Sequence, residues 1–163
     1  MACIDVGCAR YGGDYSIERL AQEFQPDFIY GFDPASDYEP RFSLDKTEVR
    51  VSKAAAWVHD GETGFKVAGL GGHVDSRSPS LVECVDLAGV IVDVYEKHGP
   101  GLVLKVDAEG AEYYLLEHLI AQGADELLEL AWVEWHPGTI KDGVGRRMGI
   151  EASIGCALTE WRW

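Results

Sequence analysis

The sequence lacks the features that mark several classes of protein. None of its apolar runs is long enough to span a membrane, and the longest candidate, LAGVIVDVY, carries Asp93 in its middle. The amino terminus, MACIDVG, has neither a basic segment nor a cleavage pattern, so we expect no signal peptide and a cytoplasmic protein. The four cysteines form no CxxC pair and have no zinc-like spacing, so we expect reduced thiols.

Basic residues are scarce. The chain has 14 Lys and Arg against 28 Asp and Glu, which gives a formal net charge of −14. A surface of that sign repels phosphate backbones and anionic lipids, so we expect neither nucleic acid nor a membrane as partner. A nucleotide in a local pocket and a neutral or cationic small molecule stay compatible with this charge. The sequence carries no indication of oligomeric state.

The chain also has no internal repeat and no linker, so residues 1–163 are expected to form one domain. Strand-like and helix-like segments alternate, which predicts an α/β fold with a mostly parallel sheet and helices on both faces. Strands are expected at residues 2–6, 28–32, 48–57, 102–107 and 127–135, and helices at residues 16–24, 87–98 and 110–122. Residues 35–48 give a weak signal, residues 64–69 could form a hairpin arm, and residues 69–80 read as a loop. The last 25 residues could add a helix and a short strand.

The first candidate site is the glycine-containing turn IDVGCARYGG after the first strand. Gly7 would let a ligand approach the backbone, and Gly12 would complete the turn. Asp33 lies 21 residues after Gly12, near the spacing of the acid that receives ribose hydroxyls in Rossmann-like folds. The pattern is GxxxxGG and not GxGxxG, which favours a ligand without pyrophosphate, and Asp5 suits a cationic amino-acid tail. The alternative is a plain turn with a surface aspartate.

The second candidate site is LKVDAEGAEYYLL, where a strand leads into Asp107 and Glu109 and a helix begins with Glu112 nearby. Acids at a helix amino terminus can simply satisfy free backbone amides. Three acids within six residues exceed that need, and the carboxyl edge of a parallel sheet is where ligands bind in open α/β folds. Both interpretations stay open for each acid.

The third candidate site is WVEWHPG. On a strand, Glu134 and His136 share one face, and a neighbouring KVDAE strand would bring them beside Asp107 and Glu109. A histidine there could remove a hydroxyl proton near neutral pH. The alternative is a hydrogen-bonded turn residue.

Together these sites resemble the FkbM-type methyltransferases, a branch of the class I S-adenosylmethionine-dependent enzymes. The similarity spans residues 3–136 and is most specific in the K-x-D-x-E-G-A-E segment. The matching segments are IDVGCARYGGDYS, Phe32-Asp33-Pro34, KAAAWVHDGETGF, Lys105 to Glu112 and Val133-Glu134-Trp135-His136.

The resemblance implies a Rossmann-like class I methyltransferase domain of near-minimal size, with S-adenosylmethionine as cofactor. Asp5 and Gly7 would lie by the methionine portion, Asp33 by the ribose and Ala55-Ala56 beside the adenine. The cofactor-binding set is then Asp5, Gly7, Gly12, Asp33, Ala55, Ala56 and Asp107.

The expected reaction transfers a methyl group to a hydroxyl oxygen of a small-molecule or saccharide-type acceptor. The protein must position the acceptor and assist its deprotonation. His136 is the predicted base, with Asp107 or Glu109 orienting the acceptor.

Three alternatives stay open at this stage. A metal-assisted variant would use Asp107, Glu109, Glu134 and His136 as ligands, although no spacing demands it. A dinucleotide-dependent oxidoreductase would need the GxGxxG pattern that is missing here. A non-catalytic Rossmann-like module would bind the cofactor without turnover.

Overall fold

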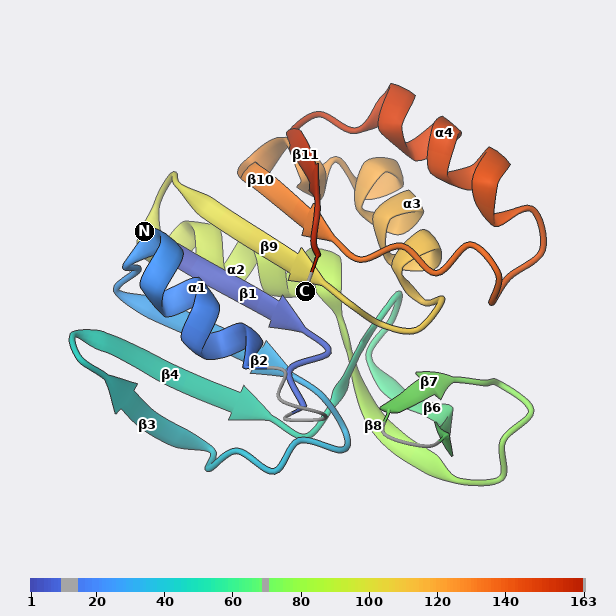
Figure 1. The fold of residues 1–163 in the computed structure, drawn as a ribbon, viewed down its shortest axis with the longest axis horizontal. Coiled ribbons are helices and arrows are strands. Elements are labelled where there is room, and N and C mark those ends of the chain that lie inside the picture. The colour runs from blue at the N-terminus through green and yellow to red at the C-terminus, as the bar shows by residue number, and fades with distance from the viewer. Residues whose placement is uncertain (10–14, 69–70, 163) are drawn as a thin grey trace.

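The computed structural model describes residues 1–9, 15–68 and 71–162, in which strands and helices alternate along the chain (Figure 1). The strands are β1 (Ala2–Val6), β2 (Phe28–Phe32), β3 (Arg41–Leu44), β4 (Thr47–Ser52), β5 (Ala55–Trp57), β6 (Gly61–Ala68), β7 (Gly71–Val74), β8 (Leu81–Asp86), β9 (Leu102–Val106), β10 (Leu128–Val133) and β11 (Ala157–Glu160). The helices are α1 (Ser16–Phe24), α2 (Leu87–His98), α3 (Glu112–Gln122) and α4 (Gly143–Ser153), with a short 3-10 helix, η1 (Ala124–Leu127).

Seven strands form the main sheet in the order β11-β10-β9-β1-β2-β4-β3. All neighbours pair in parallel except β3, which runs antiparallel to β4 at one edge. From β1 the chain builds outward through β2 and β4, and it then returns to place β9 on the other side of β1. The strand order therefore reverses between β1 and β9, and the predicted mixed α/β fold with a mostly parallel sheet is confirmed.

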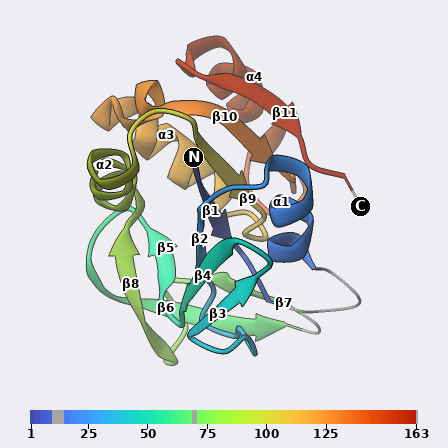
Figure 2. The same cartoon turned by 90° about the vertical axis from the view of Figure 1, so that its left-hand side faces the viewer.

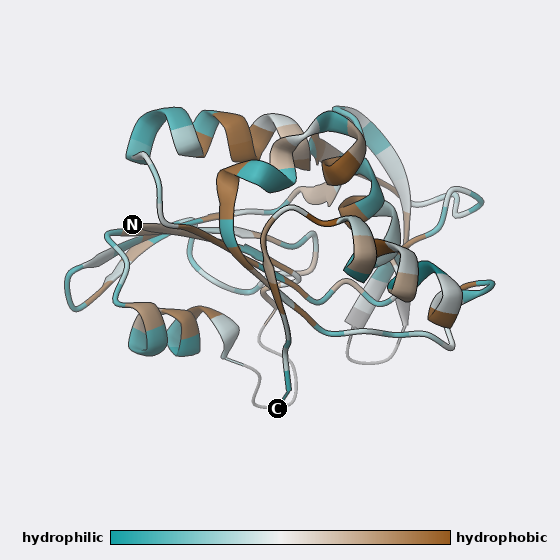
Figure 3. Ribbon diagram, turned by 90° about the horizontal axis from the view of Figure 1, so that it is seen from above, coloured by the Kyte–Doolittle hydropathy of each residue, from teal (hydrophilic) through white to brown (hydrophobic). Residues whose placement is uncertain are grey.

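Burial on both faces explains why β1 is apolar at every position except Asp5. Ile4 and Val6 belong to one core cluster with residues of α2 and α3, whereas Cys3 belongs to a second cluster with Ile17 and Leu20 of α1. Figure 3 shows α1 on one side of the sheet, with its hydrophilic residues turned away from it. Helices therefore cover both faces of the sheet.

The apolar spacing of the first two helices predicts their bounds, but Ser16, which the sequence suggests as the cap of α1, donates its hydroxyl to Asp5 instead. α1 ends at Gln25 in the left-handed conformation, and the carboxylate of Asp86 accepts a hydrogen bond from Ala88 N at the start of α2. The predicted bounds 16–24 and 87–98 are confirmed. The expected helix 110–122 begins only at Glu112, because Gly110 has a φ of +103° and belongs to the preceding turn.

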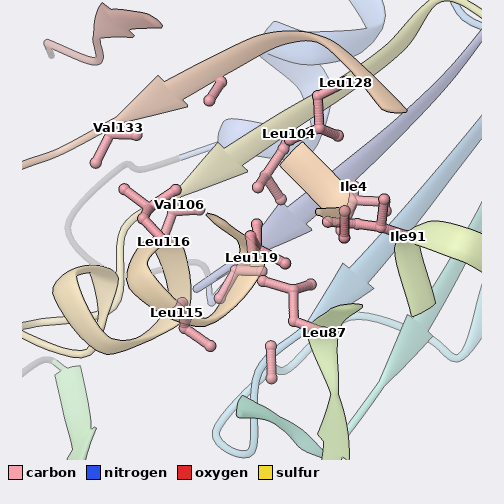
Figure 4. Packing of buried hydrophobic residues seen from close by; sticks show 14 of the residues in the cluster. Ile4, Leu87, Ile91, Leu104, Val106, Leu115, Leu116, Leu119, Leu128 and Val133 are labelled. Atoms are coloured by element: carbon pink, nitrogen blue, oxygen red, sulfur yellow. The ribbon is translucent and has the colours of Figure 1, made fainter. Parts of the chain in front are cut away.

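The larger core cluster lies between the sheet and the second layer of helices. Figure 4 shows Leu87 and Ile91 of α2 gathered with Leu119 of α3 and with Ile4 and Leu104 of the sheet. All five side chains are inaccessible to solvent. Each contributes on the order of 1.5–3 kcal/mol through its removal from water.

A second sheet that the sequence does not predict follows β4. The expected strand 48–57 divides at Lys53 and Ala54: β4 stays in the main sheet, and β5 joins a four-stranded sheet of order β5-β8-β6-β7. The segment 69–80, expected to be a loop, contributes β7, and the weak segment 35–48 contributes β3. These short strands pair with distant segments, so their own sequences carry little signal.

The small sheet lies beyond the carboxyl ends of β1 and β2 (Figures 1 and 2). It therefore flanks the edge of the main sheet where the candidate residues were expected. Among the described residues, no helix has the length and apolarity that a membrane crossing requires.

Neighbouring residues of α2 test this packing. Ile91→Ala should lower the free energy of unfolding by about 2–5 kcal/mol, because it leaves a cavity against the sheet. Val92→Ala should lower it by less than about 1 kcal/mol, because that side chain is 39% exposed. Urea denaturation measures both, and equal losses would mean that α2 presents a different face to the core.

Candidate functional site

A buried ion pair lies at the point where the strand order reverses. The Lys105 ammonium group lies 3.1 Å from Asp5 Oδ1, and both side chains are completely buried. Ser16 donates a hydrogen bond to Asp5 Oδ2 at 2.6 Å, and Lys105 donates one to Gly7 O at 2.8 Å. Burial raises the pKa of Asp5, and the charge of Lys105 opposes that shift. Lys105 thereby connects β9 to the turn that follows β1.

Gly7 and Asp107 touch at the ends of these two strands. Gly7 has a φ of +78°, and a Cβ atom added to it would lie 1.7 Å from Asp107 O. Backbone hydrogen bonds continue past the strands here, from Gly7 N to Phe32 O and from Asp107 N to Val6 O, each at 3.0 Å. Glycine at position 7 is thus required by the close approach of the protein's own backbone.

A small pocket opens at this edge of the sheet. Five of the predicted cofactor-binding residues line it: Gly7, Asp33, Ala55, Ala56 and Asp107. Its volume is about 50 Å³, room for a few water molecules. Phe65 and Val74 of the β6–β7 hairpin form part of its wall. The sequence therefore predicted a set of residues that the fold brings together, although the hairpin narrows the space between them.

The carboxylate of Asp33 accepts backbone hydrogen bonds at this pocket. Its Oδ2 accepts a hydrogen bond from Ala9 N at 3.2 Å, and its Oδ1 accepts one from Ala35 N at 2.7 Å. Burial raises the pKa of the carboxyl, and these two hydrogen bonds lower it in part. Each carboxylate oxygen keeps a second lone pair for a ligand.

Two more cofactor-binding residues were predicted, Asp5 and Gly12. Asp5 does not line the pocket, because its carboxylate is buried in the pair with Lys105, so the expected contact with a methionine portion is corrected to a supporting role beneath the site. Gly12 lies outside the described residues.

The carboxyl ends of β9 and β10 form what we call the acidic rim, made of Asp107, Glu109, Glu134 and His136. Nε2 of His136 lies 3.7 Å from Asp107 Oδ1, 3.7 Å from Glu134 Oε1 and 3.9 Å from Glu109 Oε2. Glu109 has a φ of +49°, a left-handed conformation that costs a non-glycine residue about 1 kcal/mol. β9 and β10 are neighbours, so the predicted meeting of these four residues is confirmed.

Glu112 holds the rim from behind. Its carboxylate is completely buried, accepts hydrogen bonds from His136 N at 2.8 Å and Gly110 N at 2.7 Å, and lies 3.2 Å from His136 Nδ1. Glu112 therefore satisfies backbone amides, as one of the two interpretations predicts, although these amides lie in the turn before α3 and at His136. Burial lowers the pKa of His136, but the hydrogen bond with Glu112 and the charges of Glu112, Asp107 and Glu109 outweigh it and raise the pKa to about 9.

A larger cleft that the sequence did not reveal adjoins the pocket. Its volume is about 670 Å³, and it lies between the small sheet and the start of α3, with Glu109 in its lining. Trp57 and Tyr114 line it with ring centroids 5.8 Å apart, and His73 and Val74 line both the cleft and the pocket. Most of its lining comes from the strands and loops of the small sheet, and Glu109 is the one predicted site residue, among those the structure describes, that lines it.

Replacement of Gly7 tests the contact between the two strand ends. Gly7→Ala should lower the free energy of unfolding by about several kcal/mol, because the added Cβ meets Asp107 O. The melting temperature should fall accordingly. Gly123→Ala is the matched control: Gly123 has a φ of +70° with open space around it, so the loss there should be about 1–2 kcal/mol. Equal melting curves for the two variants would contradict the close approach.

Comparison with protein-family models, with curated proteins and with solved structures finds no match to this chain. The chemistry of the site therefore rests on its own geometry.

Proposed function

We propose that the protein transfers a methyl group from S-adenosylmethionine to a hydroxyl oxygen of a small-molecule acceptor, on a Rossmann-like methyltransferase fold. One observation carries the proposal: Gly7, Asp33, Ala55 and Asp107 line one pocket at the point where the strand order reverses. Ligands of open α/β sheets bind at that point, outside the carboxyl ends of the strands. The resemblance of residues 3–136 to the FkbM-type methyltransferases supports the same reading.

The residues present suit this cofactor in kind. Asp33 offers lone pairs to ribose hydroxyls, and Ala55 and Ala56 leave a small apolar surface for a flat adenine ring. The pocket volume of about 50 Å³ is too small for an adenosyl group. Binding therefore requires that the β6–β7 hairpin, which brings Phe65 and Val74 to the pocket, shifts outward.

The acceptor would occupy the 670 Å³ cleft, whose lining reaches the rim at Glu109. The bound cofactor supplies an activated methyl group, and the chain's own residues align the acceptor and take up its proton. Asp107 and Glu109 are carboxylates with lone pairs for that hydroxyl. His136, predicted from the sequence as the base, carries a proton near neutral pH in the ligand-free protein and would first have to lose it. Its role as the base stays a prediction.

The first test concerns the cofactor. Asp33→Ala should weaken S-adenosylmethionine binding by about 1.5–3 kcal/mol, roughly 10- to 150-fold in Kd, the range for a charge-assisted hydrogen bond. It should also lower the melting temperature, because Ala9 N and Ala35 N lose their acceptor. Isothermal titration calorimetry well below both melting temperatures gives the binding constants.

Asp86→Ala is the matched control, because it removes a comparable carboxylate bond to a backbone amide, that of Ala88, outside the pocket. It should lower stability and leave the Kd unchanged. Equal affinity of all three proteins for S-adenosylmethionine would exclude Asp33 as the ribose acceptor. Tighter binding of NAD in the same assay would contradict S-adenosylmethionine as the cofactor.

The second test concerns Glu109. Glu109→Gln should lower turnover by roughly 100-fold or more, because it removes an orienting or proton-accepting carboxylate, while the melting temperature changes little. Transfer of a radiolabelled methyl group over a panel of hydroxylated acceptors gives the rate. Glu117→Gln is the control, since Glu117 is a similarly exposed carboxylate on α3 outside the rim.

Unchanged turnover in Glu109→Gln would remove Glu109 from the reaction. Tight S-adenosylmethionine binding without turnover on any acceptor would instead favour a non-catalytic cofactor-binding module.

A further inference from the structure

The acidic rim gathers several carboxylates around one imidazole nitrogen at distances longer than hydrogen bonds. Three carboxylate oxygens surround Nε2 of His136 at 3.7–3.9 Å. A charge-assisted hydrogen bond between nitrogen and oxygen is about 2.7–2.9 Å long, so none of the three acids bonds directly to this nitrogen. The donor atoms of Asp107, Glu134 and His136 lie close enough together to share one ligand.

These separations suit a shared cation better than pairwise bonds. Metal–ligand distances of about 2.0–2.2 Å place neighbouring ligand atoms roughly 3–3.6 Å apart. One donor atom each from Asp107, Glu134 and His136 lies within 4.8 Å of the others. Movements of a few tenths of an ångström at the closest pairs, and somewhat more at the widest, would complete the coordination.

The second observation lies behind the rim and concerns the orientation of the imidazole. Glu112, completely buried and not itself a candidate ligand, holds both the backbone N and Nδ1 of His136. Nε2 is thereby turned toward the carboxylates. A metal-binding histidine almost always has its other ring nitrogen bound to a carboxylate, a carbonyl or water in this way.

We propose that Asp107, Glu134 and His136 bind one divalent first-row transition-metal ion, with Mn²⁺ as its representative and Glu109 at the edge of the site. The donors are carboxylate oxygens and one imidazole nitrogen, a mixture that Mn²⁺ accepts, whereas Mg²⁺ and Ca²⁺ prefer oxygen alone. Lys105 lies 3.8 Å from Asp107 Oδ2, which leaves Oδ1 directed at the ion.

The bearing of this ion on catalysis rests on the proposed methyl transfer, whereas its binding does not. At the rim the ion would polarise an acceptor hydroxyl beside the cleft and make its proton easier to remove.

Binding is tested without any cofactor. Chelator-treated protein is titrated with Mn²⁺ at about 0.15 M salt, where distant surface charges are screened, and the free ion is followed by electron paramagnetic resonance. We expect one Mn²⁺ per chain and little competition from Ca²⁺. Asp107→Asn and His136→Ala should each weaken binding at least tenfold.

Two further variants separate a site from general attraction to an acidic chain. Asp93→Asn removes the same charge from an exposed position on α2 and should bind Mn²⁺ as the unmodified protein does. Glu112→Gln should weaken binding about 10- to 100-fold through loss of the supporting contact. Circular dichroism shows whether Glu112→Gln folds. If it does not, the Mn²⁺ affinities of Asp107→Asn and His136→Ala test the site.

The absence of saturable Mn²⁺ binding, or equal weakening in Asp107→Asn and Asp93→Asn, would overturn the inference. Calorimetry with S-adenosylmethionine on the same protein reports on the proposed function separately, so the two failures are distinguishable.

Discussion

The ammonium group of Lys105 lies enclosed beside the carboxylate of Asp5, and neither side chain reaches solvent. An isolated charge in such surroundings would cost more free energy than a domain has to spare, so each group is tolerated only because the other is present. The same ammonium group also binds the carbonyl of Gly7. Neighbouring strands and the floor of the pocket are thus fixed by one electrostatic contact, and the remaining site residues are arranged around it.

The acids near this contact differ in their exposure to solvent. Glu112 is buried and binds the backbone and the imidazole of His136. The three rim acids are partly exposed to solvent. Repulsion among the acids is offset by the single imidazole between them. A cationic partner at this edge would therefore be attracted by several carboxylates at once, and an anionic one would be repelled.

Most strands of the main sheet could be predicted from the sequence because their signals are local, whereas β3 lies in a segment with a weak signal. The apolar run of β1 and the apolar spacing of α1 depend on near neighbours, and their bounds agree with the structure. The strands that precede Asp107 and His136 are also predicted, although β9 ends at Val106 and β10 at Val133, one and two residues before the predicted ends. The small sheet could not be predicted, because strands such as β7 are glycine-rich and acquire their structure through distant pairing. The burial of Lys105 could not be predicted from the sequence either, because a lysine on a strand is ordinarily exposed.

The strands of the small sheet all lie between residues 55 and 86, and β5 and β8 lie side by side, with Ala55 opposite Cys84 and Trp57 opposite Asp86. The chain therefore leaves the main fold and rejoins it at adjacent points. A segment anchored in this way can lengthen or shorten between its ends at a cost of about 0.6 kcal/mol for each doubling of a flexible loop, with no strain on the parallel strands. The outer wall of the cleft can thus diverge in length and sequence while the inner edge, built from β1 and β9, stays as it is.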